Sequence, residues 1–495
     1  MRSRWSYVFL SLFPSCARSS RQTIPPMESL VRLYYASAVS AADPKSRVMK
    51  CLTVTDSSLD VSTENMHDST PLSPSTPVYL IAFGKASGGM AQGAEEVLST
   101  HLRKGIVIVP HGTEGLRLNS QVLYGAKNNL PDEDSVNATG KILEMIDNAE
   151  DDSVFVVLIS GGGSALLSYP IDGVTLDDKL ETIKQMVSIG ADIEQLNRVR
   201  RELSRVKGGG LARRIGDRKT IALIFSDIIG NPMDLIASGP TVGGERGNVC
   251  ALLDQLDITQ SIPSSVIKAL NNTQDLPTIS SNICNVIVCS NEDAISAMKE
   301  ETEKEGYEAI IVSTTVQGDA SSFGHSLARL ALASHPQQLS QLISHSVCTS
   351  SLSFLLFLQA NSWPSKDVAI TSNRVALLFG GETTVLVKEG KGGRNQHAAL
   401  AALLQLHSSK VSSSFCLLIA GSDGQDGPTD AAGAIVSSCL FPLDPQSVEC
   451  AQSSFDSTDS YNFWKSFRDG QYHFQPGLSG TNVMDLAVLL IHFPS

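Results

Sequence analysis

Two basic side chains stand in glycine-rich segments that are typical of anion-binding loops. Lys85 lies in the segment GKASGG at 84–89, directly after the apolar run Val78–Phe83. Arg394 lies in the segment GKGGRNQ at 390–396. Glycines allow a backbone to approach a ligand closely, a lysine adds a point charge, and a guanidinium forms forked bonds to carboxylate or phosphate. The two segments therefore predict a site for a small anion, and a solvated lysine in a turn is the alternative for the Lys85 segment taken alone.

A third glycine-rich segment follows the apolar run Val154–Ile159. It reads Ser160-Gly161-Gly162-Gly163-Ser164 and leads into a helical stretch. A strand that passes through glycines into a helix presents free backbone N–H groups to a phosphate. We expect Gly161, Gly162, Gly163 and Ser164 to bind nucleotide phosphates. The alternative is a flexible turn without a ligand, which would not need three glycines.

A basic run, NRVRRELSRVKGGGLARRI, occupies residues 197–215 of an acidic chain. Basic runs most often form a solvated helix face, which is one interpretation here. The adjoining glycines favour a second interpretation, in which part of the run faces a small anion. On that interpretation we expect Asn197 and Arg198 to bind substrate, and Lys207 and Gly208 to bind phosphate.

Four carboxylates occur where apolar runs end. Asp227 follows the apolar run Thr220–Phe225 and could bind a metal, accept a hydroxyl proton or cap a helix. Glu382 stands in the segment GGE, where we expect it to bind substrate. Asp423 and Asp426 lie in the segment AGSDGQDGPTD, whose oxygen ligands suit a hard cation although the spacing differs from an EF-hand.

Short apolar runs alternate with helical stretches along most of the chain. This alternation predicts an α/β protein with a parallel sheet covered on both faces. Ligands in such sheets lie beyond the carboxyl ends of the strands, where the segments above are found. The Ser-, Thr- and Pro-rich residues 53–77 predict a solvated loop or linker. The runs Val375–Phe379 and Thr383–Lys388 follow each other closely enough to predict a hairpin.

Composition limits the classes of partner. The chain has 495 residues, 38 basic and 51 acidic, and a formal net charge of −13, so nucleic-acid binding is not expected. No apolar run approaches the ~20 residues of a membrane span. Nine cysteines without a metal-ligand spacing favour free thiols in a reducing compartment. We expect a small-molecule substrate and a monomer or homodimer.

The N-terminal residues 1–27 contain four arginines and no acidic residue. An arginine-rich, serine-rich and acid-free segment is typical of a mitochondrial transit peptide. A secretory signal and an untargeted tail of a cytoplasmic form are the alternatives, and the cysteine usage weighs against secretion. We therefore expect a cytoplasmic or mitochondrial protein.

Glycine-rich loops, a lysine, an arginine and several carboxylates in one site fit phosphoryl transfer, which depends on positioning and on charge neutralisation by Lys, Arg and Mg²⁺. The same motifs, in the same order, resemble those of the glycerate kinases that carry a C-terminal MOFRL module. The resemblance extends from about Met27 to the end. The matching segments are FGKASGGM (83–90), LISGGGSALL (158–167), LNRVRRELSRVKGGGLA (196–212), SDIIGNPMDLIASGPTV (226–242), FGGETTVLVKEGKGGRNQ (379–396), AGSDGQDGPTDAAGA (420–434) and GTNVMDLAV (480–488).

The resemblance implies transfer of the γ-phosphoryl group of ATP to D-glycerate with Mg²⁺. It implies a Rossmann-like domain at 28–260 and a smaller MOFRL-containing α/β domain at 261–495, with the active site in the cleft between them. By position, Lys85 and Arg394 match the active-site lysine and arginine of the family, and Asp227 and Asp423 match carboxylates of the cleft. Departures from the family pattern occur at 127–132, Gly210, Asn231 and 339–366.

Two other functions remain possible on the sequence alone. A hydroxypyruvate reductase-type oxidoreductase would also use glycine-rich loops, although the chain lacks a clean GxGxxG followed by an acidic ribose partner. A catalytically inactive protein that binds a phosphorylated metabolite is the second alternative.

Overall fold

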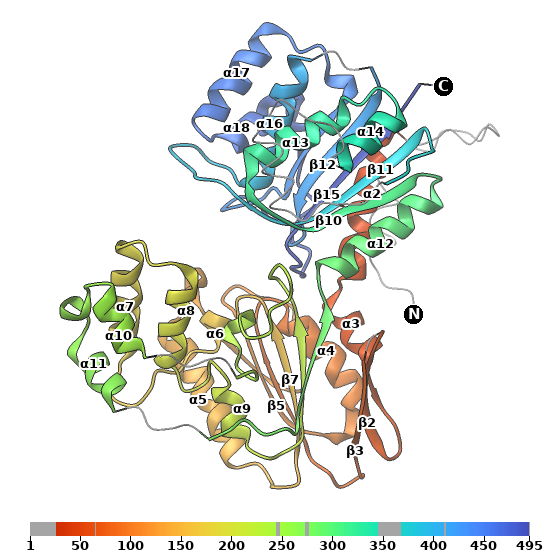
Figure 1. Ribbon diagram of the computed structural model, residues 1–495. Coiled ribbons are helices and arrows are strands. Elements are labelled where there is room, and N and C mark those ends of the chain that lie inside the picture. The colour runs from red at the N-terminus through yellow and green to blue at the C-terminus, as the bar shows by residue number, and fades with distance from the viewer. Residues whose placement is uncertain are drawn as a thin grey trace.

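The structure is a computed structural model that describes residues 26–494 except 65, 244–247, 273–276, 345–367 and 410–411. It shows two α/β domains, one above the other in Figure 1. Nearly all of the predicted targeting segment lies outside the described residues, as does most of the stretch 339–366. No helix among the described residues is both long and apolar enough to cross a membrane.

The lower domain in Figure 1 is built on a sheet of six parallel strands. In spatial order these are β6 (Gln121–Gly125), β5 (Leu102–Pro110), β4 (Val78–Phe83), β7 (Val154–Ser160), β8 (Thr220–Phe225) and β9 (Ile283–Cys289). Numbered along the chain, the order is 3-2-1-4-5-6, which is the order of dinucleotide-binding folds. The expected Rossmann-like sheet is confirmed.

Helices cover both faces of this sheet, which explains why its strands are continuously apolar. Alternate residues of β4 point to opposite faces: Leu80 joins the core beneath α3 (Pro44–Cys51) and α4 (Ser87–Leu98). Ile81 joins the core beneath α5 (Glu133–Asp147) and α9 (Gly210–Ile215). Because α4 begins at Ser87, two residues after Lys85, packing of α4 on the sheet fixes that lysine at the carboxyl end of β4.

Two smaller units extend the first domain. Four helices form a separate apolar cluster at one side of the sheet: α7 (Leu176–Ser188), α8 (Ile193–Glu202), α10 (Val249–Gln255) and α11 (Ser264–Asn271).

The predicted loop at 53–77 is wrong. Its residues contribute to an antiparallel sheet of β1 (Leu52–Val54), β2 (Ser58–Thr63) and β3 (Met66–Pro71), because Leu59 and Val61 alternate with polar residues and are buried.

The second domain has a mixed sheet with β15 at its centre. In spatial order its strands are β10 (Glu308–Asp319), β11 (Arg374–Thr384), β15 (Asp485–His492), β12 (Ser414–Gly421), β13 (Gly433–Ser437) and β14 (His473–Phe474). The predicted hairpin within 375–388 is wrong, since β11 is one strand that pairs with β15 from Arg374 to Gly381. The helices on one face are α13 (Ala320–Ala331), α14 (Pro336–Ile343), α16 (Arg394–His407), α17 (Pro445–Asp456) and α18 (Ser460–Ser466).

The described part of the chain crosses between the domains twice, on the side of α2, α3 and α12 in Figure 1. Helix α2 (Met27–Ala41) packs with α12 (Asn291–Lys304) on the other face of the second sheet, although α2 precedes the whole first domain in sequence. Strand β9 belongs to the first sheet although it lies beyond residue 260, so the second crossing falls between Cys289 and Asn291.

Candidate active site

Strand order reverses between β4 and β7, and ligands bind beyond the carboxyl ends of strands at such a point. A cavity of about 230 Å³ lies there, between the two domains. It brings together five of the predicted residues. The lining residues are Lys85, Asp227, Glu382, Arg394, Gly421, Asp423, Asn482, Met484 and Asp485.

Glycines allow the side chains of the first domain to pack directly on the backbone. The amide of Lys85 donates to the carbonyl of Gly161 at 2.8 Å, which joins the two loops. A methyl group at Gly162 would lie 3.1 Å from Cγ of Lys85, and one at Gly161 only 1.8 Å from a carboxylate oxygen of Asp227. The glycine loop therefore fixes the positions of the lysine and the aspartate.

Gly161→Ala is expected to lower kcat about 100-fold, because the added methyl group displaces Asp227 from the pocket. Steady-state kinetics measure the effect. Gly140→Ala is the matched control. Gly140 lies inside α5 with only Tyr169 near its added methyl, at 3.5 Å, so we expect normal turnover and a gain of about 0.5–1 kcal/mol in stability. Wild-type turnover by Gly161→Ala would contradict this role of the loop.

Arg394, the first residue of α16, is held by two carboxylates of the second domain. Its Nε and one terminal nitrogen donate to the two oxygens of Asp485 at 2.6 and 3.0 Å. The other terminal nitrogen lies 3.0 Å from Oε1 of Glu382. Burial by itself lowers the pKa of Arg394, but the charges of Asp485 and Glu382 raise it overall. The guanidinium is therefore a permanent, oriented positive charge.

Asp485 was not predicted from the sequence. It is the first residue of β15 and directly precedes the apolar residues Leu486–Ile491. The segment GTNV at 480–483, which the sequence did single out, ends two residues before it. Asn482, in that segment, also lines the pocket. The sequence feature that could have identified Asp485 is its position directly before an apolar run that predicts a buried strand.

The pocket carries four carboxylates against two cations. Burial raises the pKa of Asp227 and of Asp423, and the charge of Lys85 acts in the opposite direction on both. Burial also raises the pKa of Glu382, against the opposing effect of Arg394. An excess of negative charge on oxygen ligands is the environment that a hard divalent cation stabilises.

Asp426 does not line the pocket. Its carboxylate accepts hydrogen bonds from the backbone amides of Asn395 at 3.1 Å and Gln396 at 2.8 Å, and from the Gln396 side chain at 3.0 Å. It therefore caps the start of α16. This places Asp426 behind Arg394, as a residue that fixes the helix from which the arginine projects.

Lys207 is also buried and engaged by the backbone. Its Nζ donates to the carbonyls of Ser164 at 2.6 Å and Leu167 at 2.9 Å, and burial lowers the pKa of the lysine. Ser164 is the second residue and Leu167 the C-cap of the short helix α6 (Gly163–Leu166), which follows the glycine loop. The Ser164 and Ser238 hydroxyls are 2.8 Å apart, and the Gly208 amide donates to the Ser238 carbonyl at 2.9 Å. These residues hold the loop in place.

Asn197 and Arg198 lie on α8, which packs on the turn Ile236–Ser238 that also contacts α6. Both are half-buried, and neither lines the pocket. Oδ1 of Asn197 accepts a hydrogen bond from Arg200 at 3.2 Å. Nearby, Arg201 pairs with Asp234 at 3.5 Å. The structure thus places the beginning of the basic run on the helical unit beside the glycine loop.

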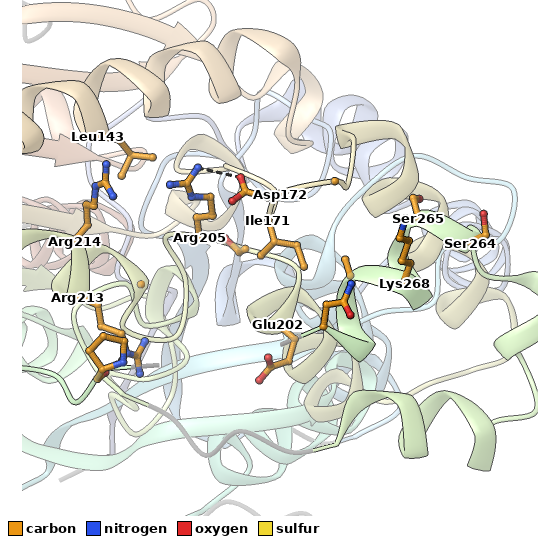
Figure 2. Close-up of a pocket in the computed structure, with 16 residues that line it drawn as sticks. Leu143, Ile171, Asp172, Glu202, Arg205, Arg213, Arg214, Ser264, Ser265 and Lys268 are labelled. Atoms are coloured by element: carbon orange, nitrogen blue, oxygen red, sulfur yellow. Dashed lines mark hydrogen bonds and ion pairs between the residues drawn. The ribbon is translucent and has the colours of Figure 1, made fainter. Parts of the chain in front are cut away.

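A larger cavity, of about 1070 Å³, lies in the first domain and shares no residue with the pocket. Figure 2 shows that its arginines come from α9 and the loop before it. Arg205 pairs with Asp172 at 3.2 Å, and Arg213 donates to the carbonyls of Pro277 and Gly208, both at 2.8 Å. Of the predicted site residues, none lines this cavity and five line the smaller pocket.

Comparisons with known proteins find relatives over most of the chain. Residues 30–271 match a domain of unknown function, DUF4147, and residues 375–485 match the MOFRL family. The chain is 36% identical over 492 residues to a Mus musculus glycerate kinase, covering 93% of this chain and 92% of that one. It is 33% identical over 417 residues to a D-glycerate 2-kinase of Thermotoga maritima, covering 84% and 90%.

The fold is similar as well. A crystal structure of a Thermotoga maritima glycerate kinase superposes with a TM-score of 0.73 and 29% sequence identity, covering 94% of this chain and 99% of that chain. A two-domain α/β fold, the motifs that line its cleft and these relatives lead to one conclusion. The chain belongs to the glycerate kinase family that carries the MOFRL domain.

Proposed function

We propose that the protein transfers the γ-phosphoryl group of ATP to D-glycerate. The observation that carries this proposal is the convergence of Lys85 and Arg394, one from each domain, on a cavity of about 230 Å³ with four carboxylates. A cavity of this size suits a three-carbon acid and the reacting phosphate, and it is smaller than the ~300–1,000 Å³ sites of larger ligands. The nucleotide phosphates would lie along Gly161–Ser164, which Lys207 and Gly208 support.

Each charged group has a role in this reaction. Phosphoryl transfer spreads negative charge over the equatorial oxygens, and oriented cations stabilise that charge. Lys85 and Arg394 supply these oriented positive charges. Asp227, whose pKa is raised by burial, would accept the proton of the attacking hydroxyl. Glu382 would hold Arg394 in the orientation that receives the substrate carboxylate.

Mg²⁺ fits the same pocket. Glu382 and Asp485 are engaged by Arg394, so Asp423 is the acidic side chain of the second domain that remains to hold the ion. The Asp423 carboxylate accepts one backbone hydrogen bond, from Gln425 at 3.0 Å, which leaves further lone pairs for a ligand. When bound, Mg²⁺ supplies charge neutralisation and orientation of the phosphate oxygens.

Asp423→Asn is expected to raise the Mg²⁺ concentration for half-maximal activity about 10-fold or more, because one anionic ligand is lost. Protons compete with the ion for acids whose pKa is raised, so the apparent Mg²⁺ affinity of the wild type should increase with pH. Mg²⁺ titrations of turnover at several pH values measure both effects. The control is Asp430→Asn in the same segment, where the carboxylate accepts from the Tyr461 hydroxyl at 2.7 Å. Equal Mg²⁺ dependence in both variants would contradict the assignment.

The proposed function is tested by a coupled assay of ADP formation. We expect ADP only when the protein, ATP, Mg²⁺ and D-glycerate are all present. Absence of glycerate-dependent ADP formation would contradict the kinase proposal. NADH oxidation with hydroxypyruvate would support an oxidoreductase instead, and thermal stabilisation by glycerate without turnover would support a metabolite-binding protein.

A further inference from the structure

Asn291 stands where the chain enters the second domain for the last time. One residue, Ser290, separates β9 of the first sheet from Asn291, the first residue of α12. The Asn291 side chain is buried, with 2% of its surface exposed. Its Nδ2 donates to the carbonyl oxygens of Val483 at 2.7 Å and Asp485 at 3.1 Å. Asn291 therefore bonds the backbone of the pocket residue that holds Arg394.

Asn291 also packs against the strand that carries the other partner of Arg394. A methyl group at Gly380 would lie 1.7 Å from Oδ1 of Asn291 and 2.6 Å from its Cγ. Gly380 is part of β11 and lies two residues before Glu382. The Asn291 amide thus fills the space that a side chain at Gly380 would take on β11, and it also hydrogen-bonds the backbone of β15. It contacts both strands whose carboxylates orient the arginine.

The first crossing between the domains is hydrogen-bonded to the same part of the chain, residues 481–485. The Thr481 hydroxyl donates to the carbonyl of Ala42, which lies between α2 and α3, at 2.7 Å. Arg47 of α3 pairs with Asp293 of α12 and so joins the two crossings. Both connections between the domains are therefore bonded to residues 481–485, which contribute directly to the pocket.

We propose that Asn291 is a positioning residue that transmits the relative orientation of the two domains to Arg394. The inference rests on the proposed function. A rotation of the first domain moves the chain at residues 289–291 and displaces the Asn291 amide. Because this amide contacts both β15 and β11, its displacement changes how Asp485 and Glu382 present the guanidinium. Arg394 is then aligned with the reacting phosphate only when the domains enclose the substrate.

The first test uses Asn291→Asp. This isosteric change removes the donor to two carbonyl oxygens and places a carboxylate beside them. We expect kcat/KM for D-glycerate to fall about 100-fold, the size of effect produced by small misplacements in an active site. The KM for ATP should remain within about two-fold, because the nucleotide phosphates are proposed to lie along Gly161–Ser164 of the first domain, away from the strands that Asn291 contacts. The matched control is Asn282→Asp, since exposed Asn282 also donates to a backbone carbonyl, that of Asp217 at 2.8 Å. The control should keep wild-type kinetics. Wild-type kcat/KM in Asn291→Asp would overturn the inference.

The second test separates positioning from packing. Asn291→Ala leaves a void beside Gly380, and Asn291→Ala with Gly380→Ala refills part of it. We expect the double variant to regain Tm while kcat/KM for glycerate stays about 100-fold low, because the hydrogen bonds are not restored. Recovery of kcat/KM together with Tm would show a structural role only and overturn the inference.

Hydrogen exchange of residues 481–485 supplies a readout that does not depend on turnover. Exchange there should accelerate in Asn291→Ala and stay fast in the double variant, and unchanged exchange in both would overturn the inference. If the wild-type protein shows no glycerate kinase activity, the proposed function fails, whereas hydrogen exchange still decides whether Asn291 fixes the pocket segment.

Discussion

Lys85→Met is expected to lower kcat about 1,000-fold, because phosphoryl transfer depends on cations placed against the developing charge. Methionine retains a long aliphatic side chain that can pack on Gly162, whereas the charge is lost. Lys85 is exposed, so the thermal unfolding of the variant should match that of the wild type. Steady-state kinetics with saturating ATP and glycerate measure the loss.

The control for this variant is Lys127→Met. Lys127 is an exposed lysine that follows β6, at the same end of the first sheet, and it does not line the pocket. It should retain wild-type turnover. Unchanged turnover in Lys85→Met would remove Lys85 from the mechanism, and an equal loss in Lys127→Met would show that the effect is not specific to the pocket.

Arg394→Lys is expected to lower kcat/KM for D-glycerate about 100-fold or more, although the charge is retained. A lysine cannot reproduce the three contacts that Arg394 makes with Asp485 and Glu382, at 2.6, 3.0 and 3.0 Å. Asp485 is buried, so weakening its ion pair should also cost on the order of 3 kcal/mol of stability. Kinetics and thermal unfolding measure the two effects separately.

Arg214→Lys is the comparison for this change. Arg214 pairs with Asp147 on the surface of the first domain, where both side chains are 42% exposed. Exposed pairs contribute less than about 1 kcal/mol, so we expect normal kinetics and nearly normal stability. If Arg394→Lys behaved like Arg214→Lys, the forked contact would have no role in the site.

The site in the first domain could be predicted because its chemistry follows strands directly. Lys85 and Asp227 each come after a fully apolar strand, and the carboxyl ends of parallel strands meet at one edge of a sheet. Arg394 could be identified from its glycines. Asp485 was missed because its role depends on pairing with Arg394 across 91 residues of chain, and a single aspartate before an apolar run does not reveal that partner.

Lys207 and Asp426 are both buried, and burial explains why their contacts differ from the phosphate and cation binding that the sequence predicts for them. Both have residue types that suit ligand binding, and both lie beside glycines. The Lys207 ammonium donates to two backbone carbonyls at the short helix α6, and the Asp426 carboxylate caps α16. Local sequence does not show which backbone groups a long-range contact will leave without partners.

The organisation of the domains was only partly predictable for a related reason. Helix α2 and strand β9 each pack in the domain on the other side of the expected boundary. Helix and strand periodicity predicts that an apolar face will be buried, but it does not specify the partner. Whether residues 1–27 direct the protein to mitochondria stays a prediction, and sequencing of the mature N-terminus would test it.

The central claim is phosphoryl transfer to D-glycerate, and phosphorus NMR of the reaction mixture tests it most directly. With the protein, ATP, Mg²⁺ and D-glycerate, we expect a new phosphomonoester resonance to grow in step with ADP, at the shift of a phosphoglycerate. Comparison with authentic 2- and 3-phosphoglycerate would identify the hydroxyl that is phosphorylated. Two results would contradict the account: ADP formation with inorganic phosphate as the sole other phosphorus product, or a spectrum that does not change when D-glycerate is added.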